Sequence, residues 1–328
     1  MARYRHSTRL IVAFLVVALL TAGAAAACSA RAGIEAAASG DGGADAAGAQ
    51  GAGAAAGDTG AARAKAPAGA DMTRIRTALG YMRAVKPSKP IVVLLGGSAA
   101  RESTISDASW RAQIKAEGGP ATLAWNMGSR NRSMAENVAL VKHLPEGAQV
   151  VVFIGINLGS FTSAAKSASI PLPSPLPTAP PSLQQPHQYS VKTGVLSKAK
   201  KKTLPGKWLK DRYPVYKRNY QGSAQVLEKL IRLCQTRGYK PVLFELPRNV
   251  PVVGSSLKAP TEKYRRTCKT LAAKYDVPWV SLVARAKLPN SSFYDLWHLV
   301  EPGRKVWQKL LSAKAAALLR QYETDGGP

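Results

Sequence analysis

The sequence predicts an α/β fold in which helices cover both faces of a parallel β-sheet of about five strands. Short, continuous apolar runs recur along the chain at the length of buried parallel strands. Between them lie stretches in which apolar residues recur with the period of an amphipathic helix. This alternation is typical of a three-layer domain, which gathers functional groups beyond the carboxyl ends of its strands.

Five apolar runs define the predicted strands. The first, residues 91–95, stops at Gly96 and Gly97, as a buried strand stops at a turn. The others are residues 122–125, 150–154, 242–246 and 277–283. A helical pattern follows each run, in the order 107–117, 133–143, 216–237, 261–275 and 302–322. Ser133 and Glu136 have the spacing of a capping box, which marks the start of the second of these helices.

One segment interrupts the alternation. Residues 162–214 are longer than an ordinary connection, and their prolines exclude a regular helix or an inner strand. Basic residues crowd the second half, alongside Trp208 and Tyr213. We expect this insertion to be an active-site cover that meets an anionic surface; a solvated basic loop is the alternative. The prolines are Pro171, Pro173, Pro175, Pro177, Pro180, Pro181 and Pro186, and the basic residues are Lys192, Lys198, Lys200, Lys201, Lys202, Lys207, Lys210 and Arg212.

Residues 1–28 have the organisation of a secretory signal. Three arginines within the first nine residues precede an apolar run, residues 10–20, and small residues follow up to position 27. The run is shorter than the ~20 residues that span a bilayer, so a transmembrane anchor is the less favoured alternative. Cys28 follows three alanines and resembles a bacterial lipoprotein cleavage site; its lipidation is left open. We expect a protein that is secreted or lipid-anchored to the outer face of a bacterial membrane.

Composition divides the remainder of the chain. Residues 29–71 are mostly Ala and Gly with scattered Asp, cannot supply a core and predict a disordered tether. The folded domain is expected over residues 72–322, with residues 323–328 as a disordered tail.

The net charge narrows the choice of partners. It is +27, with 46 Lys and Arg against 19 Asp and Glu, and this excess predicts an anionic neighbour. Because the chain begins with an export signal and has neither aromatic-interleaved basic repeats nor zinc-finger spacing, we expect envelope polymer or lipid head groups and no nucleic acid.

Cysteine and histidine usage disfavours a metal site. With Cys28 in the signal region, Cys234 and Cys268 are a pair in an oxidising compartment, for which a disulfide and two buried free thiols both remain open. The four histidines are scattered and offer no set of zinc ligands, so we expect no metal and no cofactor.

Three residues just after predicted strands carry groups suited to acyl chemistry. Ser98 follows two glycines that permit a tight turn. The amide of Gly128 can point at a developing oxyanion, and the carboxamide of Asn157 can donate a second hydrogen bond to the same oxygen. Each block taken alone also fits an ordinary turn.

The most specific block lies just ahead of the last helix. Asp295 precedes His298 by three residues, a spacing that lets the carboxylate accept the proton on one ring nitrogen while the other acts as a base. Of the four histidines, only His298 has an acidic residue at this spacing.

In their order and placement, the four blocks resemble those of the SGNH (GDSL-type) hydrolase family over about residues 90–322. This resemblance implies a flavodoxin-like sheet, Ser98 as nucleophile, His298 as base and Asp295 as its partner. It also implies an oxyanion hole made by the Ser98 and Gly128 amides and the Asn157 side chain.

The departures from the family pattern indicate a divergent branch. Gly-Gly-Ser replaces the usual Gly-Asp-Ser, and Asn157-Leu158 replaces the usual Asn-Asp. Residues 245–248, Glu-Leu-Pro-Arg, also resemble the envelope-located members that transfer or remove acyl groups, although they equally fit a strand-ending turn.

We therefore expect an exported serine esterase or O-acyltransferase acting on acyl groups of envelope glycans or lipids. The leading alternative is a catalytically inactive domain that binds anionic polymer or a partner protein. A flavodoxin-type nucleotide binder is disfavoured, because neither Gly-x-Gly-x-x-Gly nor a P-loop follows any predicted strand.

Overall fold

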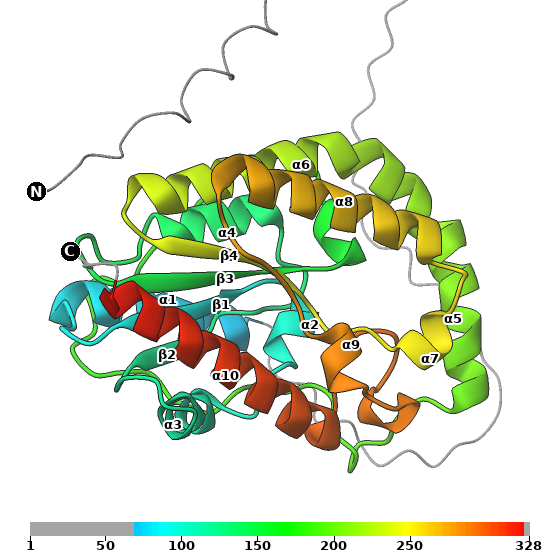
Figure 1. Cartoon of the computed structure of the whole chain (residues 1–328), viewed down its shortest axis with the longest axis horizontal. Helices are drawn as coiled ribbons and strands as arrows, with labels where there is room; N and C mark the ends of the chain where they lie inside the picture. The colour runs from blue at the N-terminus through cyan, green and yellow to red at the C-terminus, as the bar shows by residue number, and fades with distance from the viewer. Residues whose placement is uncertain (1–68, 325–328) are drawn as a thin grey trace, which may run out of the picture. The chain divides into compact units, whose positions relative to one another are not determined.

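The computed structural model describes residues 69–324, which contain one five-stranded sheet (Figure 1). Its strands run in the order β2-β1-β3-β4-β5, and every neighbouring pair is parallel. This is the strand order of flavodoxin-like folds, so the predicted fold class is confirmed. The strands are β1 (Ile91–Leu95), β2 (Leu123–Asn126), β3 (Val150–Ile156), β4 (Lys240–Glu245) and β5 (Trp279–Ser281).

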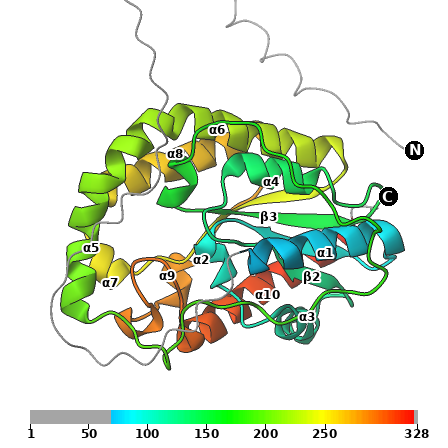
Figure 2. The ribbon, with the colours of Figure 1, turned by 180° about the vertical axis from the view of Figure 1, so that it is seen from behind.

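Helices cover both faces of the sheet, and the side chains of successive strand residues point alternately to the two helix layers. Val93 packs in the core shared with α1, α4, α6 and α8, whereas its neighbour Val92 packs in the core shared with α3 and α10. Figure 2 shows α1 across the first of these faces, and Figure 1 shows α10 and α3 on the other. The helices are α1 (Ala70–Val85), α2 (Ser98–Arg101), α3 (Asp107–Ala116), α4 (Met134–Val141), α5 (Lys198–Asp211), α6 (Tyr213–Thr236), α7 (Val250–Val253), α8 (Lys258–Tyr275), α9 (Val283–Ala286) and α10 (Glu301–Thr324), with 3₁₀ turns η1 (Leu158–Phe161) and η2 (Asn290–Ser292).

The ends of the chain lie outside the described residues. This applies to the predicted signal, to Cys28 and to nearly all of the predicted tether and tail. The helices extend slightly beyond the predicted domain, since α1 begins at Ala70 and α10 ends at Thr324. Among the described residues, no helix combines the length and the apolar character needed to cross a membrane.

The insertion contains a helix that the sequence argument excluded. The prediction that residues 162–214 hold no regular helix is wrong for their second half, where α5 runs from Lys198 to Asp211. The crowded prolines end at position 186, and only Pro205 falls inside α5. Its missing amide weakens the helix, but Pro205 and Trp208 are buried, so packing against the domain compensates.

Cys234 and Cys268 are both buried free thiols. Burial raises the pKa of the Cys234 thiol to about 12 and that of the Cys268 thiol further still, so neither is a reactive thiolate at neutral pH. Of the two alternatives that the sequence left open, the structure has the free thiols.

Strand register brings the predicted functional residues to one edge. Leu95 of β1 pairs with Ile154 of β3, and Ser98 and Asn157 each lie three residues beyond this pair. On the other side of β1, Leu94 pairs with Asn126 of β2, two residues before Gly128. The carboxyl ends of three adjacent strands therefore present these residues together.

Candidate active site

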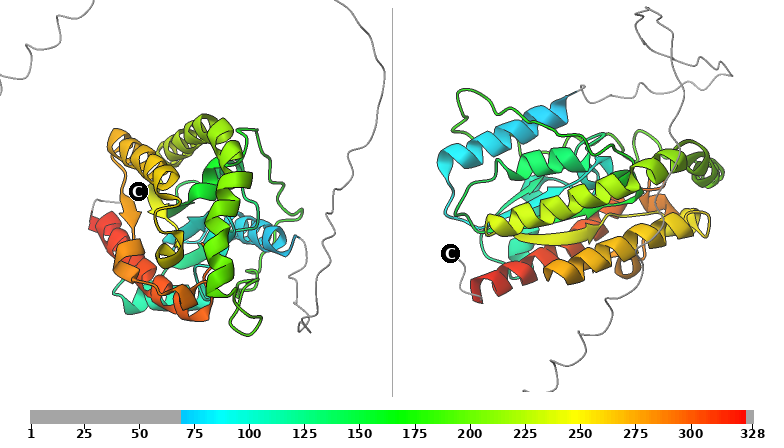
Figure 3. Two further views of the ribbon diagram at one scale, coloured as in Figure 1. Left: turned by 90° about the vertical axis from the view of Figure 1, so that its right-hand side faces the viewer. Right: turned by 90° about the horizontal axis from the view of Figure 1, so that it is seen from above.

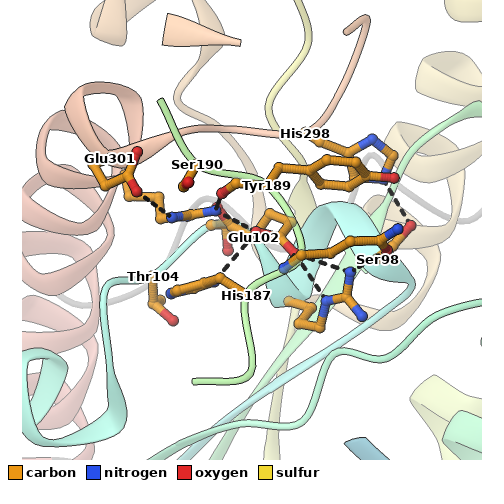
Figure 4. A network of polar contacts seen from close by, with 12 residues as sticks. Ser98, Glu102, Thr104, His187, Tyr189, Ser190, His298 and Glu301 are labelled. Atoms are coloured by element: carbon orange, nitrogen blue, oxygen red, sulfur yellow. Dashed lines mark hydrogen bonds and ion pairs between the residues drawn. The ribbon is translucent and has the colours of Figure 1, made fainter. Parts of the chain in front are cut away.

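Ser98, His298 and Asp295 form a continuous chain of hydrogen bonds, and Figure 4 shows the one between Ser98 and His298. Ser98 is the first residue of α2, and its Oγ lies 2.8 Å from His298 Nε2. The other ring nitrogen, Nδ1, lies 2.7 Å from Asp295 Oδ2. The structure thus joins residues 200 positions apart in the arrangement of nucleophile, base and orienting carboxylate.

The Asp295 carboxylate is held in place by the loop that carries it. Oδ1 accepts hydrogen bonds from the amides of Trp297, at 2.9 Å, and His298, at 3.0 Å. Burial alone would raise the pKa of Asp295, but the His298 charge and these hydrogen bonds outweigh burial and hold the pKa below its ordinary value. An ionised carboxylate at Nδ1 keeps the proton on that nitrogen and leaves Nε2 as the acceptor facing Ser98.

Two residues that the sequence argument missed fix the position of this loop. Lys201 is 1% exposed, and its Nζ donates to the carbonyls of Asn290, at 3.0 Å, and Phe293, at 2.5 Å. Asn249 Nδ2 donates to the Asp295 carbonyl at 2.9 Å. Lys201 stands in a run of lysines, and nothing in the sequence distinguishes it from its exposed neighbours.

The predicted oxyanion donors are not equivalent in the structure. The Ser98 amide is the first of a helix, and such amides have no partner within the helix. Asn157 lies between β3 and η1, where its backbone amide donates to Ser160 Oγ at 3.1 Å. Its side chain is partly exposed at the same sheet edge as Ser98.

The Gly128 amide is not free, contrary to the sequence expectation. It donates to Asn126 Oδ1 at 2.9 Å, which closes an Asx turn. A glycine is needed at this position because a Cβ would lie 2.3 Å from the Arg101 amide nitrogen. Asn126 Nδ2 also donates to Ala100 O at 2.7 Å, and this hydrogen bond holds α2 against the end of β2. For Gly128 to bind an oxyanion, its hydrogen bond to Asn126 has to break.

The insertion reaches the candidate site through Tyr189. Its ring centroid lies 4.6 Å from that of His298 (Figure 4) and 4.2 Å from that of Tyr294. Burial, followed by the charges of Asp295 and Glu102, raises the pKa of the Tyr189 phenol to about 12. Tyr189 therefore packs beside the His298 imidazole as a neutral aromatic side chain.

A buried carboxylate ties the insertion to the helix that carries Ser98. Glu102, which follows α2, is 0% exposed and accepts from the Gln188 amide at 2.9 Å and from Arg101 Nε at 2.9 Å. It also pairs with Arg304 of α10 and with His187 (Figure 4). Arg304 in turn donates to the Tyr189 carbonyl, so one network holds both Ser98's helix and the Tyr189 segment.

Glu102→Gln is expected to lower stability by about 3 kcal/mol at neutral pH. Burial alone would raise the pKa of Glu102, but the His187 hydrogen bond and the Arg304 and Arg101 charges lower it to about 2, against 4.5 ordinarily. This stabilisation is complete above about pH 4.5 and is lost as the pH falls towards 2. Urea unfolding of both proteins across this range should show the difference between them shrinking as the pH falls. Glu262→Gln, at a 48% exposed carboxylate with a 3.9 Å ion pair, is the control; a constant difference for Glu102→Gln would contradict the pKa assignment.

Among the described residues, there is no group of three or more His, Cys, Asp or Glu side chains placed to hold a metal ion.

Comparison with known proteins finds matches among solved structures alone. No family model matches the sequence, and no curated protein matches it. One matching structure is a candidate platelet activating factor from Streptococcus pneumonia, with 12% identity, 75% of this chain and 92% of the other covered, and a TM-score of 0.42. Another is a candidate lipolytic protein of the G-D-S-L family from Desulfitobacterium hafniense DCB-2, with 12% identity, coverage of 68% and 97%, and a TM-score of 0.36.

A third match is AlinE4, an SGNH-hydrolase family esterase, with 16% identity, coverage of 72% and 97%, and a TM-score of 0.35. The second and third descriptions name the family that the four sequence blocks resemble.

Proposed function

We propose that the protein is a serine esterase or O-acyltransferase that uses Ser98 as nucleophile, His298 as base and Asp295 as the residue that orients the base. One observation carries the proposal, namely the hydrogen-bonded chain from Ser98 Oγ through both nitrogens of His298 to Asp295. No other histidine has a carboxylate three residues earlier in the sequence.

In the first half-reaction, Ser98 Oγ attacks the carbonyl carbon of an ester while His298 Nε2 takes the hydroxyl proton. Asp295 stabilises the imidazolium that forms, and the Ser98 amide and the Asn157 carboxamide are the proposed donors to the oxyanion. The intermediate collapses, the ester C–O bond breaks, and the leaving alkoxide takes the proton from Nε2. Ser98 then carries the acyl group.

In the second half-reaction, His298 takes a proton from water or from a sugar hydroxyl, whose oxygen attacks the acyl carbon. The bond from this carbon to Ser98 Oγ then breaks, and Nε2 returns the proton to Ser98. Hydrolysis and transfer differ in how well the site excludes water and positions the acceptor. The proposed substrates are ester-linked acyl groups of envelope glycans or lipids. The signal-like residues 1–28 and the net charge of +27 support an exported protein with an anionic neighbour and without nucleic acid as a partner.

Labelling with a fluorophosphonate probe tests this proposal. The probe should modify the wild-type chain at one residue, and peptide mapping should identify Ser98. Denatured protein is the control for labelling that does not need the folded site. Modification of another residue, or none, would remove Ser98 as nucleophile.

The engaged Gly128 amide favours a second candidate function. With this donor occupied by Asn126, an oxyanion would have fewer stabilising contacts than the sequence predicts. A domain in this state would bind anionic polymer or a partner protein without catalysis. Strongly salt-dependent polymer binding together with an unlabelled Ser98 is the result that distinguishes this function.

A further inference from the structure

The exposed side of α5 is rich in lysine, and the one acidic residue of this helix, Asp211, stands at its last position. Five of its lysines are exposed, and we call them the lysine face; the buried side of the same helix consists of Lys201, Pro205 and Trp208. None of these five takes part in an ion pair with another described residue. The lysine face consists of Lys198, Lys200, Lys202, Lys207 and Lys210.

The positions of these lysines do not stabilise helix α5. Lys198, Lys200 and Lys202 stand at the amino end of α5, where the helix dipole disfavours positive charge. Like charges one helical turn apart, as at Lys198 and Lys202, also repel each other. A binding partner outside the domain explains the presence of these lysines better than a contribution to the stability of the fold does.

Helix α5, which carries the lysine face, packs with its buried side against the loop that carries the candidate base. Buried Lys201, on the opposite side of α5, holds the carbonyls of Asn290 and Phe293. Just before α5, the Leu196 amide donates to the Tyr294 carbonyl at 3.3 Å. Figure 3 shows α5 at the same end of the domain as α7 and α9, next to this loop. A polymer that extends from the lysine face past the amino end of α5 would therefore come near the loop that carries His298.

The composition of α5 fits a polymer better than a membrane surface. Helices that bind bilayers expose an apolar face for insertion, but Trp208 is buried and Leu204 and Leu209 pack against the core. From Lys198 to Lys210 the helix extends ~18 Å, long enough to meet several charged repeats. Lysines act as flexible point charges without a fixed bidentate geometry, which suits a chain of anionic groups.

We propose that the lysine face binds an anionic polysaccharide and delivers its ester groups to Ser98. The proposal deepens the proposed esterase function and rests on it for the delivery step, whereas binding alone does not require catalysis.

The test uses the full chain and two O-acetylated polysaccharides, one anionic (polygalacturonate) and one neutral (xylan). The variant K200Q/K202Q/K207Q/K210Q neutralises four of the five lysines and leaves Lys201 intact. At low salt, its kcat/KM for deacetylation of the anionic polymer should fall roughly tenfold, because four exposed charge contacts, each weak by itself, are lost together. Its kcat/KM on the neutral polymer should stay at the wild-type value, and added salt should weaken the wild-type preference for the anionic polymer.

The matched control K89Q/K115Q/K229Q/K269Q removes the same charge from exposed lysines elsewhere on the domain. It should keep the wild-type preference. If kcat/KM on the anionic polymer falls equally in both variants, the preference comes from net charge and the proposal is overturned. If this kcat/KM falls in neither variant, the proposal is also overturned. Binding to vesicles of anionic phospholipid, but not to polygalacturonate, would overturn it in favour of a membrane.

Binding of polygalacturonate to Ser98→Ala, with and without the four glutamines, separates this inference from the esterase proposal. If no ester is hydrolysed but the glutamines weaken binding, the lysine face stands and the esterase function fails. If esters are hydrolysed but the glutamines leave binding unchanged, the lysine face is wrong.

Discussion

Ser98→Ala should lower kcat for ester hydrolysis by a factor on the order of 10⁴ to 10⁶, the range seen when a member of a serine triad is removed. The substitution takes away the atom that forms the covalent intermediate and leaves its surroundings in place. Ser98 Oγ bonds to His298 Nε2, and no other hydrogen bond of this oxygen is found among the described residues. Since Ser98 is partly exposed, its loss orphans no buried group, and stability should change by less than about 0.5 kcal/mol.

Hydrolysis of a short-chain p-nitrophenyl ester measures the effect, and thermal unfolding verifies the fold. Ser190→Ala is a matched control: this serine follows Tyr189 in the insertion, and its hydroxyl bonds to Thr193 rather than to the triad. The control should retain wild-type turnover. A Ser98→Ala protein that is folded and hydrolyses the ester at the wild-type rate would refute the role of Ser98.

Local signals in the sequence account for the elements that were predicted well. The run at 91–95 coincides with β1, because a fully buried strand is apolar along its whole length and Gly96 ends it. The predicted strand at 277–283 is longer than β5, which contains only Trp279–Ser281. Apolar residues continue into the turn and into α9, so hydrophobicity alone did not mark the end of this strand.

Short sequence patterns predict some contacts of the candidate site but not others. The spacing of Asp295 and His298 is a local feature, and the structure has the predicted contact between them. The burial of Lys201 depends on carbonyls about 90 residues away, which no local pattern reveals. The engagement of the Gly128 amide, in contrast, had a local signal: an asparagine two residues before a glycine favours an Asx turn.

Asp295→Asn should lower kcat by about 10⁴-fold while leaving the loop intact. Asn retains an oxygen at the position of Oδ1, which accepts from the Trp297 and His298 amides. At the position of Oδ2, 2.7 Å from His298 Nδ1, it places an NH₂ group instead. This group donates to Nδ1, so the ring proton moves to Nε2 and points at Ser98 Oγ. An imidazole in that tautomer cannot accept the Ser98 proton, although every heavy atom stays in place.

The tautomer gives this prediction a readout apart from rate. In protein with ¹⁵N-labelled histidine, the Nδ1 and Nε2 resonances of neutral His298 should exchange their protonated and unprotonated character between wild type and Asp295→Asn. Asp276→Asn is the control, because Asp276 is exposed at the end of α8 in a left-handed conformation, φ 49°, which Asn also tolerates. If Asp295→Asn kept both the wild-type tautomer and the wild-type rate, His298 would not depend on this carboxylate. The hydrogen-bonded chain from Ser98 to Asp295 would then be a structural contact rather than a catalytic one.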